Sequence, residues 1–97
     1  MRQGWLYILS NRRDGTLYVG VTSDLRRRLA QHRSGTGSAF VRRHGLHRLV
    51  YAERHELVAA AIQREKLIKS WPRAWKVRLI HSINSDWHDL ADDLFDA

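Results

Sequence analysis

The sequence contains no cysteine and only one proline among its 97 residues. The absence of cysteine excludes disulfide-linked scaffolds, cysteine-ligated zinc sites and thiol catalysis. Long apolar runs are also missing, because the longest extends only from Leu57 to Ile62 and a membrane span needs roughly 20 apolar residues. Residues 1–9 are too weakly apolar for a secretory signal. We therefore expect a cytoplasmic protein that has no membrane partner.

Acidic residues are scarce in most of the chain. All 17 Lys and Arg residues but only five acids lie within residues 1–85, which gives this part a formal charge of +12. Residues 86–97 carry the other five acids, all of them Asp. A body this positive is expected to bind a polyanion, although a high-Arg proteome would produce the same composition. The length and charge predict one small domain over residues 1–85 and an acidic C-terminal tail over residues 86–97.

Short apolar runs and turn residues predict the secondary structure. Residues 5–9 and 17–21 are typical of strands, and Asp14-Gly15 between them indicates the turn of a β-hairpin. Capping residues and helix formers predict three helices, at about 24–33, 57–70 and 73–83. A loop is expected at 34–38 and a third strand at 47–51. The order β-β-α-β-α-α predicts an α+β fold, a small three-stranded, mainly antiparallel sheet flanked by helices.

Two polar residues share the inward face of the first predicted helix. At 100° per residue, Arg28 and His32 lie beside Leu25 and Leu29, which must face the sheet. Burying these side chains costs free energy unless a partner compensates. The ordinary explanation is that Arg28 extends along the edge of the core to solvent and that His32 is a hydrogen-bonded core histidine.

Glu65 lies on the inward face of the second predicted helix, and it is the only carboxylate between Glu56 and Asp86. Its structural interpretation is an i,i+4 ion pair with Lys69. Its functional interpretation is a ligand for one Mg²⁺ or Mn²⁺ ion, since Mg²⁺ keeps several waters and takes only one or two protein carboxylates. A two-metal site would need several convergent carboxylates, which this basic chain does not supply.

Tyr7 and Tyr18 lie on the two strands of the predicted hairpin, where cross-strand aromatic packing is the ordinary explanation. That packing does not explain why Arg28, His32 and Glu65 should also face inward. A phenol of pKa near 10 is a poor base unless neighbouring positive charge lowers its pKa, and Arg28, His32 and a metal could each contribute.

An ordered series of motifs runs along most of the chain. Trp5-Leu6-Tyr7 is followed by Tyr18-Val19-Gly20, and then by Asp24-Leu25, Arg28 and His32. This series resembles the GIY-YIG nuclease superfamily, most closely its small single-domain, excision-nuclease-like subgroup. Later segments are also similar to that subgroup: Gly37-Ser38, residues 43–45, 48–51, 61–66, 68–71 and 84–90. Two positions depart from its pattern, because Trp-Leu-Tyr replaces Gly-Ile-Tyr and Ser85 replaces a usual Pro, but neither removes a chemical group that the reaction needs.

The resemblance implies a structure-sensitive or weakly specific DNA endonuclease that uses one Mg²⁺ or Mn²⁺ ion. It also implies that six residues form one site. Glu65 would bind the metal, and Arg28 would hold the scissile phosphate. Tyr18 is the better candidate for the general base, with Tyr7 close by. His32 would accept a proton from a tyrosine, and Asn84 matches the active-site asparagine of the family. The alternatives are a non-catalytic DNA- or RNA-binding module on the same fold and a nuclease that acts on RNA.

Exposed basic residues are expected to contact phosphates of the nucleic acid. The candidates are Arg12, Arg13, Arg27, Arg42, Arg43 and Lys69. A merely solvated charged surface is the ordinary alternative for such residues. We expect a monomer or a weak dimer, which associates with the nucleoid if the protein comes from a bacterium.

Overall fold

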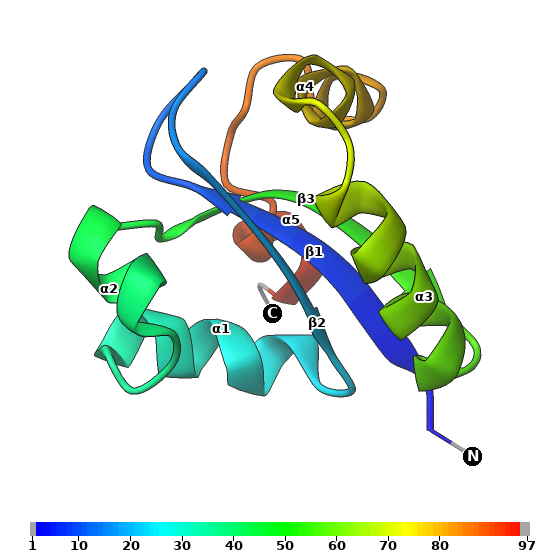
Figure 1. Cartoon of the computed structure of the whole chain (residues 1–97). Coiled ribbons are helices and arrows are strands. Elements are labelled where there is room, and N and C mark those ends of the chain that lie inside the picture. Colours follow the sequence, from blue (N-terminus) through cyan, green and yellow to red (C-terminus); the bar gives the residue numbers. More distant parts are fainter. Residues whose placement is uncertain (1, 96–97) are drawn as a thin grey trace.

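Three antiparallel strands form the centre of the structure, a computed structural model that describes residues 2–95 (Figure 1). The strands are β1 (Gly4–Ser10), β2 (Leu17–Thr22) and β3 (Arg48–His55), in the sheet order β2-β1-β3. Five helices surround the sheet: α1 (Leu25–Ser34), α2 (Ala39–His44), α3 (Val58–Lys69), α4 (Arg73–His81) and α5 (Ala91–Phe95). The predicted α+β fold with a three-stranded antiparallel sheet and flanking helices is confirmed.

The central strand β1 is buried on both faces, as its apolar sequence predicts. Because side chains alternate along a strand, Leu6 and Ile8 face one core and Tyr7 and Leu9 face the other. Figure 1 shows α1 and α2 on one side of the sheet and α3 and α4 on the other. The first core includes Val50, Ile68, Ile80 and Trp87, and the second includes Leu25, Leu29, Val41 and Leu46.

The short helix α2 is missing from the predicted order of elements. It follows the predicted loop at residues 34–38 and is too short to produce a recognisable apolar period. Local chemistry defines it instead: the Ser38 hydroxyl accepts hydrogen bonds from the backbone N–H groups of Phe40 and Val41. Gly45 ends the helix in the left-handed conformation at φ 64°. Val41 is fully buried and fixes α2 against the second core.

The predicted strand at residues 47–51 is too short, because β3 continues to His55. Its second half is polar, and this hides it from a search for apolar runs. The Glu53 carboxylate accepts hydrogen bonds from Tyr51 and from Arg64 of α3 and lies 2.6 Å from His55 Nε2. These contacts compensate the polar groups of the strand where it lies beneath α3.

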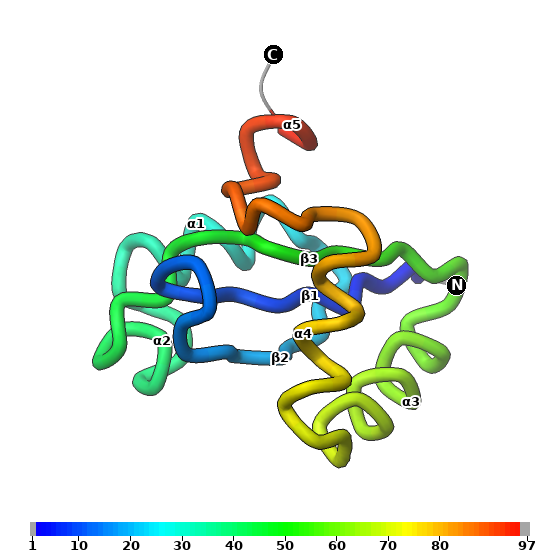
Figure 2. The backbone as a smooth tube through the Cα atoms, turned by 90° about the horizontal axis from the view of Figure 1, so that it is seen from above, coloured from blue at the N-terminus to red at the C-terminus, as the bar shows by residue number. Residues whose placement is uncertain are grey.

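The C-terminal segment lies along β3, as the orange and red parts of the tube in Figure 2 show. Trp87 is fully buried in the first core, and Ala91 is buried in the second. Acidic residues 86–95 are therefore packed onto the sheet by the apolar side chains between them. None of the helices found within residues 2–95 has the length and apolar character to cross a membrane.

Candidate active site at the edge of strand β2

The Tyr7 side chain extends from the central strand across β2, which is an edge strand. Its partner in the β1–β2 register is Gly20. A Cβ atom at Gly20 would lie 2.5 Å from both Cζ and the hydroxyl oxygen of Tyr7, closer than any van der Waals contact. The phenol, which is 1% exposed, therefore occupies space that only a glycine at residue 20 leaves open.

His32 of α1 forms a hydrogen bond with the Tyr7 hydroxyl group. The Tyr7 hydroxyl oxygen lies 2.9 Å from Nε2 of His32, and the His32 side chain is 2% exposed. Within residues 2–95, Nδ1 of His32 has no hydrogen-bond partner. Gly37 covers this ring, because a Cβ there would lie 2.6 Å from Nδ1. One ring nitrogen of His32 is therefore hydrogen-bonded within this part of the chain and the other is not, whereas both nitrogens of an ordinary core histidine have partners.

Tyr18 completes an aromatic cluster on the same face of the sheet. Its ring centroid lies 6.3 Å from that of Tyr7 and 5.6 Å from that of His32, which it meets edge-on. Phe40 of α2 stacks against the outer side of Tyr18 with a centroid separation of 6.3 Å. Tyr18 is only half-buried, so it stands between the enclosed Tyr7–His32 pair and the surface.

Arg28 and Glu65 act electrostatically on this cluster. Burial raises the pKa of Tyr7 well above its ordinary value, the neighbouring Tyr18 and Glu65 raise it further, and Arg28 opposes them. The expected lowering of a phenol pKa by Arg28 is therefore present at Tyr7 but is outweighed by burial. Burial also lowers the pKa of His32, and the charges of Arg28 and His47 lower it further. At neutral pH these shifts keep Tyr7 protonated and His32 uncharged.

Glu65 is the residue of this site that can hold a metal ion. Its side chain is 17% exposed, and its Oε2 lies 3.4 Å from Nζ of Lys69, so the predicted i,i+4 pair is present. Nowhere in residues 2–95 do three or more His, Cys, Asp or Glu side chains gather in a way that could hold a metal. A single carboxylate fits Mg²⁺ or Mn²⁺ that keeps most of its coordination sphere for water and phosphate oxygens. It does not fit a structural zinc site, which takes four protein ligands.

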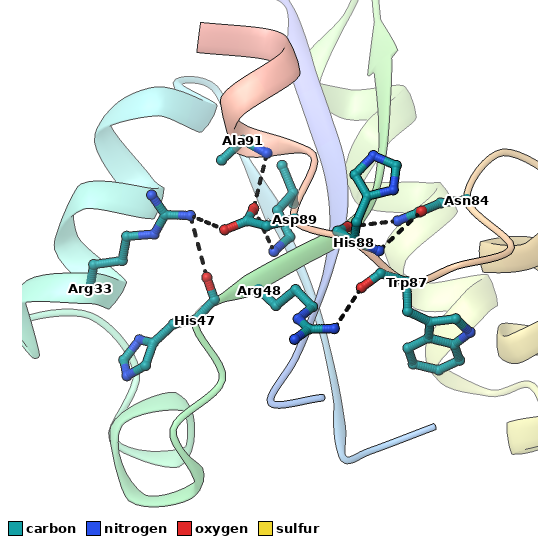
Figure 3. A network of polar contacts seen from close by, with 9 residues as sticks. Arg33, His47, Arg48, Asn84, Trp87, His88, Asp89 and Ala91 are labelled. Atoms are coloured by element: carbon teal, nitrogen blue, oxygen red, sulfur yellow. Dashed lines mark hydrogen bonds and ion pairs between the residues drawn. The ribbon is translucent and has the colours of Figure 1, made fainter. Parts of the chain in front are cut away.

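Asn84 lies at the opposite edge of the sheet, beside β3 (Figure 3). Its Nδ2 donates to the carbonyls of Val50 and His88 at 3.1 and 2.8 Å, and its Oδ1 accepts from the backbone N–H of His88. Val50 is the extra residue of a bulge between the pairs Ile8–Tyr51 and Leu9–Leu49, so its carbonyl lacks a ladder partner. The structure therefore does not bring Asn84 to the tyrosine–histidine cluster, and its amide satisfies the bulged strand.

The six predicted phosphate-binding residues are all exposed. Arg12 and Arg13 lie in the loop between β1 and β2, while the others are Arg27 of α1, Arg42 and Arg43 of α2, and Lys69 of α3. Reasoning from charge and helix faces did not single out Gly20, Gly37 or Phe40 as members of the site. Gly20 and Gly37 are part of the quoted motifs. Only the structure shows why a glycine is needed at each position, because another side chain approaches its backbone closely.

Comparison with known proteins identifies a family across most of this structure. The family model described as the GIY-YIG catalytic domain matches residues 3–78, a range that includes both tyrosines, Arg28, His32 and Glu65. Asn84 lies beyond that match.

Individual relatives share both sequence and fold with this chain. A UPF0213 protein of Natronomonas pharaonis is 43% identical over 76 residues, which cover 78% of this chain and 88% of the relative. A UPF0213 protein of Streptococcus pneumoniae is 37% identical over 84 residues, covering 87% and 83%. The solution NMR structure of a UPF0213 protein from Bacillus halodurans matches with a TM-score of 0.57 at 29% identity, over 93% of this chain and 95% of that one.

Proposed function

The chain belongs to the GIY-YIG family, and from this membership we propose that it is a divalent-metal-dependent endonuclease that hydrolyses phosphodiester bonds in DNA. Membership of a nuclease family implies a nucleic-acid substrate. The observation that supports catalysis is the cluster of Tyr7, Tyr18 and His32, which the charges of Arg28 and Glu65 both reach. A phenol, an imidazole, a guanidinium and a carboxylate at one sheet edge form the set of groups that phosphodiester hydrolysis uses.

We assign Tyr18 as the general base, because it lies between the enclosed pair and the surface. As Tyr18 accepts a proton from the attacking water, its own proton passes to the Tyr7 oxygen, and Tyr7 donates along its 2.9 Å contact to His32 Nε2. The proton therefore ends on His32, and both phenols are neutral before and after the step. In this scheme the raised pKa of Tyr7 is no obstacle, since Tyr7 relays a proton without accumulating charge.

Arg28 holds the scissile phosphate and stabilises the extra negative charge of the five-coordinate transition state, the kind of interaction that contributes most in such reactions. Glu65 would hold one Mg²⁺ or Mn²⁺ ion, which would supply Lewis-acid stabilisation of negative charge on the phosphate. With a metal on Glu65, Lys69 would lose its ion-pair partner and would be available to contact phosphate.

Substrate choice follows from the size and charge of the chain. Residues 1–85 form the proposed nuclease domain, and its exposed arginines contact the phosphate backbone without reading bases. Residues 1–85 leave no room for a module for sequence recognition beside the nuclease fold, so we propose that this domain cleaves according to DNA structure or with weak sequence preference. The acidic segment of residues 86–97 would limit non-specific binding by this basic surface, and the protein would act in the cytoplasm.

The test is cleavage of plasmid, flapped and branched DNA with Mg²⁺ or Mn²⁺ by the wild type and by Glu65→Gln. We expect Glu65→Gln to abolish cleavage while DNA binding remains. Glu56→Gln is the matched control, because the Glu56 side chain is 92% exposed and lies outside the site. Undiminished cleavage by Glu65→Gln would contradict the metal role, and no cleavage of any substrate by the wild type would contradict the nuclease.

A non-catalytic nucleic-acid-binding module on the same fold is the second candidate function. The observation that favours it is the Lys69–Glu65 ion pair, since an ammonium group can replace a metal ion as the partner of a carboxylate. This candidate predicts salt-sensitive binding of DNA or RNA without turnover. It also predicts that Glu65→Gln leaves the affinity unchanged, and competition between matched single-stranded RNA and DNA identifies the preferred ligand.

A further inference from the structure

An aromatic groove lies along α4 and the short connection that precedes it. Trp71, Trp75, Arg78, Leu79 and Ser82 line it. The Trp71 and Trp75 rings meet edge-to-face with centroids 6.0 Å apart. Trp75 is 50% exposed, which leaves a large part of its ring open to a ligand. Neither the fold nor the proposed catalytic site accounts for a half-exposed tryptophan at this position.

The groove is held in place rather than loosely arranged. Trp71 packs against the first core, and the Arg64 guanidinium lies 5.4 Å from its ring centroid. Arg64 is itself fixed, because its Nε donates to the Glu53 carboxylate at 2.9 Å. The Arg73 guanidinium anchors the start of α4 to the β1–β2 loop through the carbonyls of Asp14 and Gly15. Trp75 therefore projects from a rigid base, which lowers the entropic cost of binding to it.

The charged residues of the segment that forms the groove all have one sign. Residues 66–85 contain no acid, and their basic residues are Lys66, Lys69, Arg73, Lys76 and Arg78. In the described part of the chain, no ion pair neutralises Lys76 or Arg78. A groove that combines an open aromatic face with unpaired cations is complementary to a stacked base whose neighbouring phosphates are anionic. An apolar protein segment would leave these cations without partners.

The groove follows the proposed metal-binding residue closely along the chain. Lys69 follows Glu65 by one turn of α3, about 6 Å along the helix axis. Trp71 comes two residues later, after Ser70, in the connection to α4. A strand whose scissile phosphate lies beside Glu65 can therefore pass Lys69 and reach Trp75. We propose that the groove between Trp71 and Trp75 binds an unpaired base of the DNA substrate beside the cleaved phosphodiester, an inference that rests on the proposed nuclease function. The substrate class is thus DNA with a single-stranded segment next to a junction.

The test compares two oligonucleotides of equal length, an oligothymidylate and an abasic sugar–phosphate chain. Binding is measured by fluorescence anisotropy without divalent metal, so that no cleavage occurs. For Trp75→Ala we expect roughly 5- to 150-fold weaker binding of the oligothymidylate, the range for one lost stacked base, and unchanged binding of the abasic chain. The matched control is Leu67→Ala, because Leu67 of α3 is 51% exposed; this variant should leave both affinities unchanged.

Two outcomes would contradict the proposal that the groove binds a base. In the first, Trp75→Ala binds the oligothymidylate as tightly as Leu67→Ala does. In the second, Trp75→Ala loses as much affinity for the abasic chain as for the oligothymidylate. Concentration-dependent self-association of the wild type that Trp75→Ala abolishes would instead identify a second copy as the occupant. Trp75→Phe keeps the fold testable, since it retains an aromatic face and should recover part of the affinity lost in Trp75→Ala.

Glu65→Gln separates this inference from the nuclease itself. If this variant stops cleaving but still prefers the oligothymidylate over the abasic chain, both proposals are supported. If the wild type cleaves DNA but Trp75→Ala binds and cleaves a flapped substrate normally, the groove is wrong and the nuclease stands. If the wild type discriminates the two oligonucleotides but never cleaves DNA, the groove keeps its ligand, and only its placement beside a cleaved bond is wrong.

Discussion

Gly20 stands directly opposite Tyr7 in the β1–β2 ladder, and the Tyr7 phenol passes through the space that a side chain there would fill. This relationship gives the glycine of the Tyr18-Val19-Gly20 motif a steric reason. It places a buried hydroxyl from the central strand at the edge of the sheet, where His32 receives it.

Gly20→Ala is expected to displace the Tyr7 ring, because the new Cβ would lie 2.5 Å from its Cζ and hydroxyl oxygen. Overpacking of this kind costs about 1–3 kcal/mol of unfolding free energy, and a reacting group displaced by about 1 Å can lose on the order of 100-fold in rate. Urea unfolding and DNA cleavage measure the two effects. Val21→Ala, on the opposite face of β2, should not reduce cleavage selectively; an active Gly20→Ala variant would contradict the steric account.

Replacing each tyrosine by phenylalanine should separate the two phenols. Tyr18→Phe is expected to reduce cleavage by roughly 100- to 10,000-fold, the range for a general base, with little change in stability. Tyr7→Phe should reduce cleavage too, but it also leaves the buried Nε2 of His32 without its partner. That loss costs about 1–3 kcal/mol of unfolding free energy. Equal stabilities of the two variants would show that the Tyr7–His32 contact does not stabilise the fold.

His32 should make the protein less stable in mild acid. Its pKa in the folded state lies below the ordinary value of 6.5, so below pH 6.5 the unfolded chain binds a proton that the folded protein does not. The unfolding free energy contributed by neutral His32 is therefore present above pH 6.5 and is lost as pH falls towards the folded pKa, with a slope of at most about 1.4 kcal/mol per pH unit. The difference in unfolding free energy between the wild type and His32→Gln, measured by urea unfolding, should therefore shrink over this window. A difference that stays constant as pH falls would contradict this prediction.

Asn84→Ala is expected to lower the unfolding free energy by about 1–3 kcal/mol, because the buried carbonyl of Val50 loses its donor. Cleavage measured well below the unfolding temperature should remain close to that of the wild type. Thermal unfolding and cleavage rates on the same preparation check both statements. A variant of normal stability that has lost cleavage would return Asn84 to the catalytic set that its motif suggests.

The acidic face of α5 should weaken binding of DNA by α1. Arg26 Nη2 donates to the backbone carbonyl of Phe95 at 2.7 Å, and Arg33 pairs with Asp89 at 2.7 Å. Neutralising the exposed Asp92 and Asp93 to Asn is therefore expected to raise DNA affinity at low salt. Anisotropy titrations over a range of salt concentrations measure this. Glu56→Gln with Asp86→Asn removes the same charge from exposed residues elsewhere and should have a smaller effect.

Much of the fold follows from local sequence signals. The all-apolar segment at residues 5–9 predicts a central strand, Asp14-Gly15 predicts the turn, and Asp24 caps the helix that follows. The signals fail where tertiary contacts decide the structure. The end of β3 is polar and is stabilised by Arg64 from another element, while α2 depends on one serine cap, one glycine and one buried valine.

The candidate site divides in the same way. Helix periodicity places Arg28 and His32 on the inner face of α1, and the strand positions place both tyrosines on one face of the hairpin. The contact between Tyr7 and His32 joins residues 25 positions apart, so its geometry depends on how α1 packs on the sheet. Asn84 could not be located from its motif, because its partner is the carbonyl of a bulge that the sequence does not reveal.

Among the described residues, the C-terminal segment hydrogen-bonds to one edge strand of the sheet, β3, but not to the other edge strand, β2. Leu90 and Asp89 hydrogen-bond to the backbone of Leu49 on β3, while within residues 2–95 β2 has β1 as its one neighbouring strand. The C-terminal segment therefore blocks strand addition at Leu49 of β3, whereas β2, the border over which Tyr7 reaches, is open to pairing with a second copy. Assembly by that route and access of DNA to the site would exclude each other, so a sheet-extended dimer would be a resting form of the protein.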